Sequence, residues 1–348
     1  MDAKLFRSFT PVINIAPKFD AARLFHSTLE NREAHDPVGA SWQAAGFIRP
    51  IDGDEFLLPI DGGGHMACVQ INERNLPGAV IREAMIEKAA KTEDLTGRKP
   101  GKKEMAQIRD EVELDLLPKA FIKRKLVPIL FVKNKLFVFS SSGKVVDHVL
   151  ALLNSVADMD DMFKPVPVAH LVENNIEAEL TYLAREGNSE MTDPEGEHEV
   201  NYLSITNAGL LRGPNKEKIT ISDKNLSSQD VINLLKDESY TVTKLGIEHM
   251  LAGNTEADSS FILNDKLVFS KFTLAGAVSA RSKDKKDADT TLIGTAWLVT
   301  QGASAALDTV IGFMGGLRAT VKPSIDTPTT MSKEASKEAD EADEDDEL

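Results

Sequence analysis

The chain has 348 residues, 42% of them hydrophobic, and a formal net charge of −15. This length and composition are ordinary for a soluble protein of two or three domains, and they exclude a wholly disordered chain. The single cysteine, Cys68, excludes an internal disulfide framework and fits a reducing compartment. The first residues lack an apolar signal segment, so a cytoplasmic location is expected.

Charge is distributed unevenly along the chain. Residues 331–348 contain nine Asp/Glu and two Lys, a net charge of −7, whereas residues 98–135 contain eleven Lys/Arg and five Asp/Glu, a net charge of +6. A basic segment in an acidic chain indicates a localised anion-binding surface, so the negative total does not exclude nucleic acid as a partner. The acidic tail, from about Val321, has too few apolar residues to fold alone, and we expect it to be disordered.

The first half of the chain predicts strands and helices in mixed order. Residues 9–15 and 65–71 alternate as strands do, the second following a glycine turn at 61–64, and residues 19–30 can form a helix with one apolar face. Two longer helices follow, one starting at Pro77 and one over residues 102–117. Gly97, Pro100 and Gly101 separate them, which predicts a protruding helical hairpin.

The second half predicts further strands with few helices. Residues 121–132 and 135–141 form a strand pair, and Ser141 or Ser142 can cap a helix over 145–156. Further strands are expected at 218–225, 242–251 and 259–272, and a helix at 227–236. The polar stretches 185–199 and 280–290 are interpreted as exposed loops, and the apolar stretch 292–316 as buried core. Without regular βαβ alternation, this order indicates an α+β fold with mixed or antiparallel sheets.

Nothing in the sequence assembles a catalytic or cofactor site. The segment 140–146 lacks the first glycine of a phosphate loop, and a helix cap explains it better. Cys68 alternates with apolar neighbours and is interpreted as a core thiol, and His65 beside it has no companions for a metal set. We therefore predict a protein that is not an enzyme and that uses no cofactor and no metal.

The basic segment suits phosphate binding. Eight side chains in two groups, at the helix connection and at the start of the next strand, are candidates for DNA contact: Arg98, Lys99, Lys102, Lys103, Lys119, Lys123, Arg124 and Lys125. Lys and Arg clustered on one surface hold duplex DNA through phosphates without reading bases; the alternative is an ordinary solvated face. Phe121, among these cations, has three interpretations: a core residue, a base-stacking residue or an anchor of a protein interface.

Several blocks of the sequence resemble the RdgC family, the recombination-associated DNA-binding proteins of bacteria. The most specific is 76–121, with its LP–VI opening, charged helical pair, DEV and LLPKAF; AAGFIRP (44–50), VTKLGIE (242–248) and the segment 287–316 agree in order. The family TGEL reads TQGA here, at 300–303, and the acidic tail lies beyond the usual family end.

The resemblance implies a ring-forming subunit. RdgC proteins are homodimers that encircle double-stranded DNA with little sequence preference and restrain RecA-dependent recombination, without catalysis, as nucleoid-associated proteins. Phe121 matches a family aromatic at a subunit contact, and residues 222–231 match a segment implicated in ring closure and DNA contact. The resemblance thus adds Lys224, at both the interface and the DNA, and Lys244 to the DNA-binding candidates.

Four regions are expected along the chain: residues 1–75, an N-terminal α+β part; 76–120, the helical hairpin; 121–320, the remaining α+β region; and 321–348, the tail. For the tail there are three hypotheses: solubility, docking of partners, or competition with DNA for the basic surface. The alternative function is a partner-binding protein of the same fold, with weak DNA binding, that the tail regulates.

Overall fold

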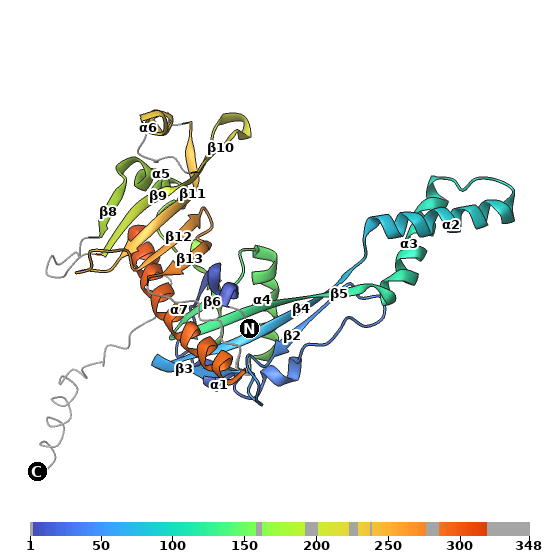
Figure 1. Ribbon diagram of the computed structural model, residues 1–348, viewed down its shortest axis with the longest axis horizontal. Helices are drawn as coiled ribbons and strands as arrows, with labels where there is room; N and C mark the ends of the chain where they lie inside the picture. Colours follow the sequence, from blue (N-terminus) through green and yellow to red (C-terminus); the bar gives the residue numbers. More distant parts are fainter. Residues whose placement is uncertain are drawn as a thin grey trace, which may run out of the picture.

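The computed structural model describes residues 3–157, 162–191, 201–222, 229–236, 239–275 and 285–318. Two antiparallel sheets form the body, and a pair of helices projects from it (Figure 1). The α+β class with antiparallel sheets is confirmed. The predicted acidic tail and Lys224 lie outside the described residues.

Sheet one has seven strands, in the order β2-β4-β5-β6-β1-β7, with β3 paired to β4. Their bounds are β1 Thr10–Asn14, β2 Gln43–Ile48, β3 Leu58–Ile60, β4 Gly64–Asn75, β5 Phe121–Val132, β6 Lys135–Val138 and β7 Pro165–Pro167. The predicted strands at 9–15 and 65–71 are thus confirmed, and so is the pairing of 121–132 with the strand after it.

Sheet two has six strands, in the order β10-β9-β11-β12-β13, with β8 paired to β9. Their bounds are β8 Asn188–Met191, β9 Asn201–Arg212, β10 Lys218–Ile221, β11 Thr241–Met250, β12 Ser259–Asn264 and β13 Phe269–Leu274. The helices are α1 Ala21–Phe25, α2 Gly78–Thr96, α3 Lys102–Leu116, α4 Gly143–Val156, α5 Ile176–Glu186, α6 Gln229–Lys236 and α7 Lys285–Phe313.

The long strands β4 and β5 carry the chain out of the body. They pair without interruption from His65 opposite Phe131 to Asn75 opposite Phe121. The inner half is buried, because Val127, Ile129 and their neighbours pack into the core. In the outer half, residues 121–125 of β5 are largely exposed, whereas Asn72 and Arg74 of β4 are buried. Helices α2 and α3 continue from the outer ends and lie side by side (Figure 1). We call these two helices and their connection the arm, and the outer half of β4 and β5 its root.

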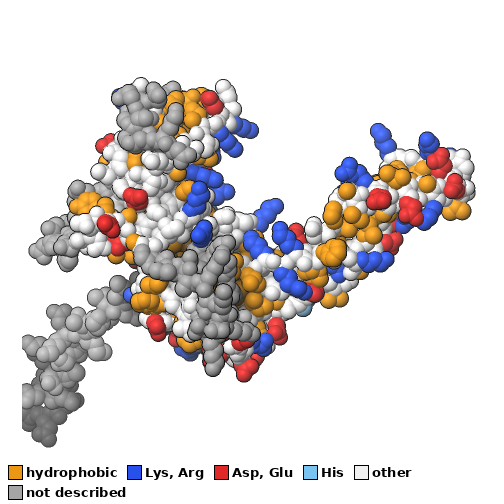
Figure 2. All heavy atoms as spheres, in the orientation of Figure 1, with side chains coloured by type: hydrophobic (Ala, Val, Ile, Leu, Met, Phe, Trp, Pro, Cys, Tyr) orange, Lys and Arg blue, Asp and Glu red, His pale blue; other side chains and the backbone are white. Residues whose placement is uncertain are grey.

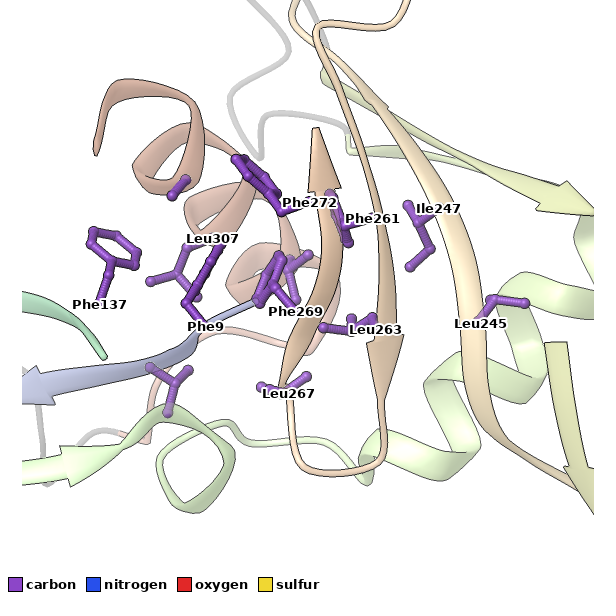
Figure 3. Close-up of a cluster of buried hydrophobic side chains, with 14 of the residues drawn as sticks. Phe9, Phe137, Leu245, Ile247, Phe261, Leu263, Leu267, Phe269, Phe272 and Leu307 are labelled. Atoms are coloured by element: carbon purple, nitrogen blue, oxygen red, sulfur yellow. The ribbon is translucent and has the colours of Figure 1, made fainter. Parts of the chain in front are cut away.

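Each face of sheet one is covered by a separate core. On one face Val127, Ile129 and Phe131 pack with side chains of α1 and α4. On the other, Leu130 and Phe137 belong to a core shared with α5, α7 and sheet two. Phe9 lies at the centre of this second core, stacked on Phe269 with ring centroids 4.7 Å apart, and it joins the two sheets (Figure 3).

Helix α7 connects the two sheets over 29 residues. Ala296, Ala303 and Leu307 are fully buried, so one side of the helix is core, as predicted for 292–316, whereas Trp297 and Leu298 on it are 37% and 44% exposed. Lys135, at the start of β6, donates to both carboxylate oxygens of Asp308 at 2.6 Å and to Ser304 at 2.9 Å. Within the described ranges, no helix combines the length and apolarity that a bilayer crossing would require.

Three local predictions were wrong in part. The predicted helix 19–30 is a short α1 followed by a 3-10 turn at Leu29–Arg32, and the Thr28 hydroxyl, bonded to the Leu24 carbonyl, sits at the break. Of the predicted loop 185–199, residues 185–186 end α5 and residues 188–191 form β8, which pairs with β9, while 192–200 lie outside the described residues. Of the predicted loop 280–290, residues 285–290 already belong to α7.

The helix starts also differ from the predictions. Pro77 is the N-cap of α2 and precedes its first turn. Ser142 is the N-cap of α4, as predicted, but its side chain makes no cap bond; the Ser140 hydroxyl accepts from the Ser142 amide at 3.2 Å instead. Cys68 is confirmed as a core thiol, since it is fully buried and burial raises its pKa to about 12.

Candidate nucleic-acid interface

The basic residues at the start of β5 lie on two faces of the strand. Side chains alternate along a strand, so Phe121, Lys123 and Lys125 project on one face and Arg124 on the other. The face of Lys123 and Lys125 continues inward through Val127 and Ile129, on the side of sheet one that α4 covers. The structure therefore groups Lys123 and Lys125 with Phe121 and separates Arg124 from them.

Arg124 is held by a loop that the sequence did not link to it. Its guanidinium donates to both carboxylate oxygens of Asp36 at 3.2 Å. The Asn72 amide, opposite Arg124 in the ladder, also donates to Asp36, at 3.2 Å. Asp36 thus compensates part of the Arg124 charge, and we expect a weaker phosphate contact there than at the neighbouring lysines.

Arg74 of β4 also holds the loop that contains Asp36. It is only 7% exposed and donates to the carbonyls of Pro37 and Gly39, at 2.6 Å each. Its Nε is buried and has no partner among the described residues. Arg74 was not predicted from the sequence, because an arginine in an alternating strand is expected to face solvent, and the segment 37–39 that covers it is distant in the chain.

Phe121 is 88% exposed at the first position of β5. The interpretation of Phe121 as a core residue of the single chain is therefore wrong, and the stacking and interface interpretations stay open. Lys119, Lys123 and Lys125 are exposed around it, and none of these three forms an ion pair with another described residue. An apolar ring left in water beside unpaired cations is expected where a second surface docks.

The connection at the far end of the arm carries the other predicted group. Arg98 donates to the two oxygens of Glu104 at 2.9 and 2.7 Å, and Glu104 also accepts from the Gly101 amide at 2.8 Å. The Arg98 guanidinium and then this amide lower the pKa of Glu104 to about 2. Arg98 therefore fixes the start of α3, which leaves Lys99, Lys102 and Lys103 as exposed cations with no ion pair within the described ranges.

The two predicted basic groups are not brought together. The 19 residues of α2 separate them, a rise of about 28 Å at 1.5 Å per residue. Both groups nevertheless lie on one projecting part of the molecule, one at each end. A partner that contacts both must be extended, as a duplex is.

Lys244 lies in the middle strand of sheet two. It is exposed, on the opposite face of β11 from the buried Leu245 and Ile247. Across the ladder it faces Leu210 and Asn264, and the next β12 residues on this face are Ile262 and Ser260. Hydroxyl, amide and ammonium groups on an open sheet face are suited to phosphate oxygens.

Three further exposed lysines near Lys244 were not predicted from the sequence. Lys218, Lys266 and Lys271 are exposed, and none of them forms an ion pair with a described residue. Lys266 occupies the turn after Asn264, which faces Lys244. Figure 2 shows Lys and Arg side chains on the side of sheet two that faces the arm, and again where the body meets the arm. Only the strand register reveals this grouping, because these lysines are scattered in sequence.

Acidic residues gather elsewhere. A pocket of about 270 Å³ is lined by Glu30, Asp54 and Glu55 with His26, Phe56 and Leu57. Its carboxylates would repel phosphate, so it is no part of the candidate interface. In the part of the chain that the structure describes, no three His, Cys, Asp or Glu side chains are grouped as a metal site requires.

Comparison with known proteins identifies the family. Residues 5–317 match the family model described as "Putative exonuclease, RdgC". The chain is 28% identical over 264 residues to the recombination-associated protein RdgC of Shewanella sp. (strain ANA-3), an alignment that covers 74% of this chain and 79% of the relative. It is 43% identical over 91 residues to the protein of the same name from Shewanella frigidimarina, where the alignment spans only 26% of this chain and 30% of the relative. Because the family model covers most of the chain, the protein belongs to the RdgC family.

Proposed function

We propose that this protein is a non-enzymatic, sequence-independent binder of double-stranded DNA. In this proposal it acts as a homodimer whose two chains close a ring around the duplex, and it limits the access of a RecA-type recombinase to DNA. Relatives named recombination-associated proteins support a role in recombination. The DNA-binding candidates, the dimer and the effect on recombination are our own inference.

One observation carries the proposal: exposed lysines without ion pairs to described residues lie both at the root of the arm and on sheet two, the two parts that extend from sheet one. The arm and sheet two extend from sheet one in different directions (Figure 1). Lys123 and Lys125 lie at the root of the arm, and Lys244 and Lys266 on sheet two, each exposed and without an ion pair to another described residue. Two such chains facing each other would enclose a space lined with cations.

Phe121 supports the dimer. Transfer of a phenylalanine side chain from water into an interface is favourable by about 2 kcal/mol. Because the Phe121 ring is 88% exposed in the single chain, a partner that covered it would gain this free energy. The arm also exposes Ile86 at 70% and Leu95 at 88%. We propose that the partner chain covers Phe121, and that its neighbours Lys119 and Lys123 then face the enclosed space.

The test is duplex affinity over a salt series, with the mass of the complex measured in parallel. Binding through phosphates requires the logarithm of the association constant to fall linearly with the logarithm of salt, by about 0.9 per phosphate neutralised. A ring predicts that covalently closed circular duplex retains the protein on salt challenge longer than linear duplex, from whose ends a ring slides off. A monomer without duplex affinity would overturn the proposal.

A nuclease is the second candidate, favoured by the family description "Putative exonuclease, RdgC". Incubation of end-labelled linear duplex with the protein and Mg²⁺ or Mn²⁺ separates the two functions. The proposal expects intact DNA at protein concentrations that saturate binding. Release of labelled nucleotides that tracks with purified protein would establish the nuclease instead.

The third candidate is a partner-binding protein of this fold with weak DNA binding, favoured by the formal net charge of −15. It predicts duplex affinity no greater than that of other acidic proteins, with little dependence on Lys123 and Lys244. Lys123→Gln and Lys244→Gln, separately and together, test this, with Lys91→Gln as the matched control. Lys91 is equally a surface lysine, but it is paired with Glu87 at 2.7 Å.

A further inference from the structure

We propose that the acidic tail, residues 331–348, docks on the exposed lysines of sheet two and competes there with the phosphates of DNA. This proposal rests on the proposed function for the competition with DNA, but the docking itself does not. We define the lysine set of sheet two as Lys218, Lys244, Lys266 and Lys271. The partner that fits this set is an extended polyanion, and the chain itself carries one.

The lysine set is available to a polyanion, although the same face of β11 also carries the exposed Glu248. None of the four lysines forms an ion pair with a described residue, although Arg212 on the same sheet is paired with Glu177 at 3.0 Å and Asp265 at 3.5 Å. By contrast, Arg98 and Lys91 on the arm each have a carboxylate at 2.7 Å. Sheet two, like the root of the arm, therefore offers unpaired cations that gain from an added anion, and the place where the tail leaves the body favours sheet two.

Arg318 is held at a place from which the tail that follows it can reach this set. The Arg318 amide donates to the Leu171 carbonyl at 2.9 Å and its Nε to the Val172 carbonyl at 3.2 Å. Residues 171–174 lead directly into α5, whose Thr181 hydroxyl accepts from the amide of Val242 in β11. The chain is thus fixed beside sheet two, and the 30 residues after Arg318 can extend at most about 100 Å.

Charge determines the competition. The last eighteen residues contain nine carboxylates and two lysines, and DNA presents a comparable row of negative charges. Because the tail is attached, its effective concentration near the lysine set is in the millimolar range typical of tethered ligands. Weak binding of the tail is then enough to raise the concentration of DNA required, and added salt screens both interactions.

The docking is tested first without DNA, in the full chain. Ser336→Cys adds a thiol to the tail, and a maleimide dye will label it selectively, because Cys68 is buried and its thiol is protonated. Fluorescence anisotropy of the dye should fall as salt rises from about 50 to about 500 mM. It should fall likewise at low salt when Lys218, Lys244, Lys266 and Lys271 are replaced with Gln, and stay unchanged in the matched variant Lys91→Gln. Anisotropy that changes neither with salt nor when the four lysines are replaced would overturn the docking.

The competition is tested next with duplex DNA. Replacing the nine tail carboxylates with Asn or Gln in the full chain should raise duplex affinity about tenfold near 50 mM salt and less than about twofold near 500 mM. Adding duplex to the labelled chain should release the tail and lower the anisotropy. Equal affinity with and without tail charge, in a chain that does bind duplex, would overturn the competition. If even the neutralised chain binds no duplex, the proposed function fails and the competition with it, and the anisotropy experiment alone then decides the docking.

Discussion

The body and the arm are stabilised in different ways. In the body, two extended apolar cores lie on the two faces of sheet one, and aromatic rings such as Phe9 and Phe269 join the sheets. In the arm, the buried apolar residues are Ile81, Ile108 and Val112. Partly buried apolar residues such as Ala84, Met85 and Met105 pack around them. Lys88 also lies 2.8 Å from Glu111 across the helix pair, but exposed ion pairs of this kind contribute little.

Because of this difference, we expect the two regions to depend differently on a partner for their stability. We expect the body to fold without a partner, because its two extended cores are already buried. The arm exposes apolar side chains along its length and at its root, so we expect its final stability to depend on what covers it. Four changes test this difference: one in the body, one in the arm, one at the contact between sheet two and α7, and one at the root of the arm.

The largest effect is expected from Phe9→Ala in the body. Phe9 is fully buried and has four aromatic neighbours, so its truncation leaves a cavity between the sheets. A loss of about 3–5 kcal/mol in the free energy of unfolding is expected, measured by urea denaturation. A loss below about 1 kcal/mol would show that the two sheets do not share a core.

A local effect is expected from Ile108→Ala in the arm. Ile108 is buried between α2 and α3, and a buried isoleucine truncated to alanine costs about 2 kcal/mol or more. Because the arm has its own small core, the amides of α2 and α3 should exchange hydrogen faster, while the urea midpoint of the body stays unchanged. A matching drop in the stability of the body would mean that arm and body unfold as one unit.

A smaller, pH-dependent effect is expected at His249, which joins sheet two to α7. Its ring lies 3.0 Å from the Thr309 hydroxyl and 3.4 Å from that of Ser259, and burial lowers its pKa despite the nearby Asp258. The unfolded chain therefore binds the proton more readily, so stability should be full above the ordinary histidine pKa of about 6.5 and decline as pH falls below it.

His249→Asn should flatten this decline, as measured by thermal unfolding between pH 8 and pH 5. Part of the slope should remain, because burial also lowers the pKa of His65. His148→Asn is the control, because His148 lies on α4, away from the contact between sheet two and α7, and its replacement should leave the slope unchanged. An unchanged slope in His249→Asn would contradict the role given to this histidine.

The sequence predicted the helices and strands better than it predicted which face of a strand each side chain lies on. The periodicity of 121–132 indicated β5, and the glycines and proline at 97–101 indicated the break between α2 and α3. The apolar residues of 292–316 indicated the buried side of α7. These signals are local, and the structure agrees with them. The proposed domain boundaries stay predictions.

The candidate interface could be predicted only in part. That Arg124 points away from Lys123 depends on strand alternation, but its pairing with Asp36 joins residues 88 apart in the chain. The lysine set of sheet two depends on the register of β11 and β12, which no local pattern reveals. For Phe121, alternating apolar residues suggested a core strand, whereas the core begins only at Val127, where α4 covers the sheet.

The most direct test of the central claim is Phe121→Ala, measured for unfolding, mass and DNA binding in one preparation. At 88% exposure the ring contributes little to the single chain, so the variant's body should unfold in urea like the wild-type body, within about 0.5 kcal/mol once dimer dissociation is accounted for. The account predicts that the dimer dissociates at higher protein concentration and that closed circular duplex is retained less well, by about tenfold or more. A variant that stays dimeric and binds circular duplex as the wild type does would contradict it.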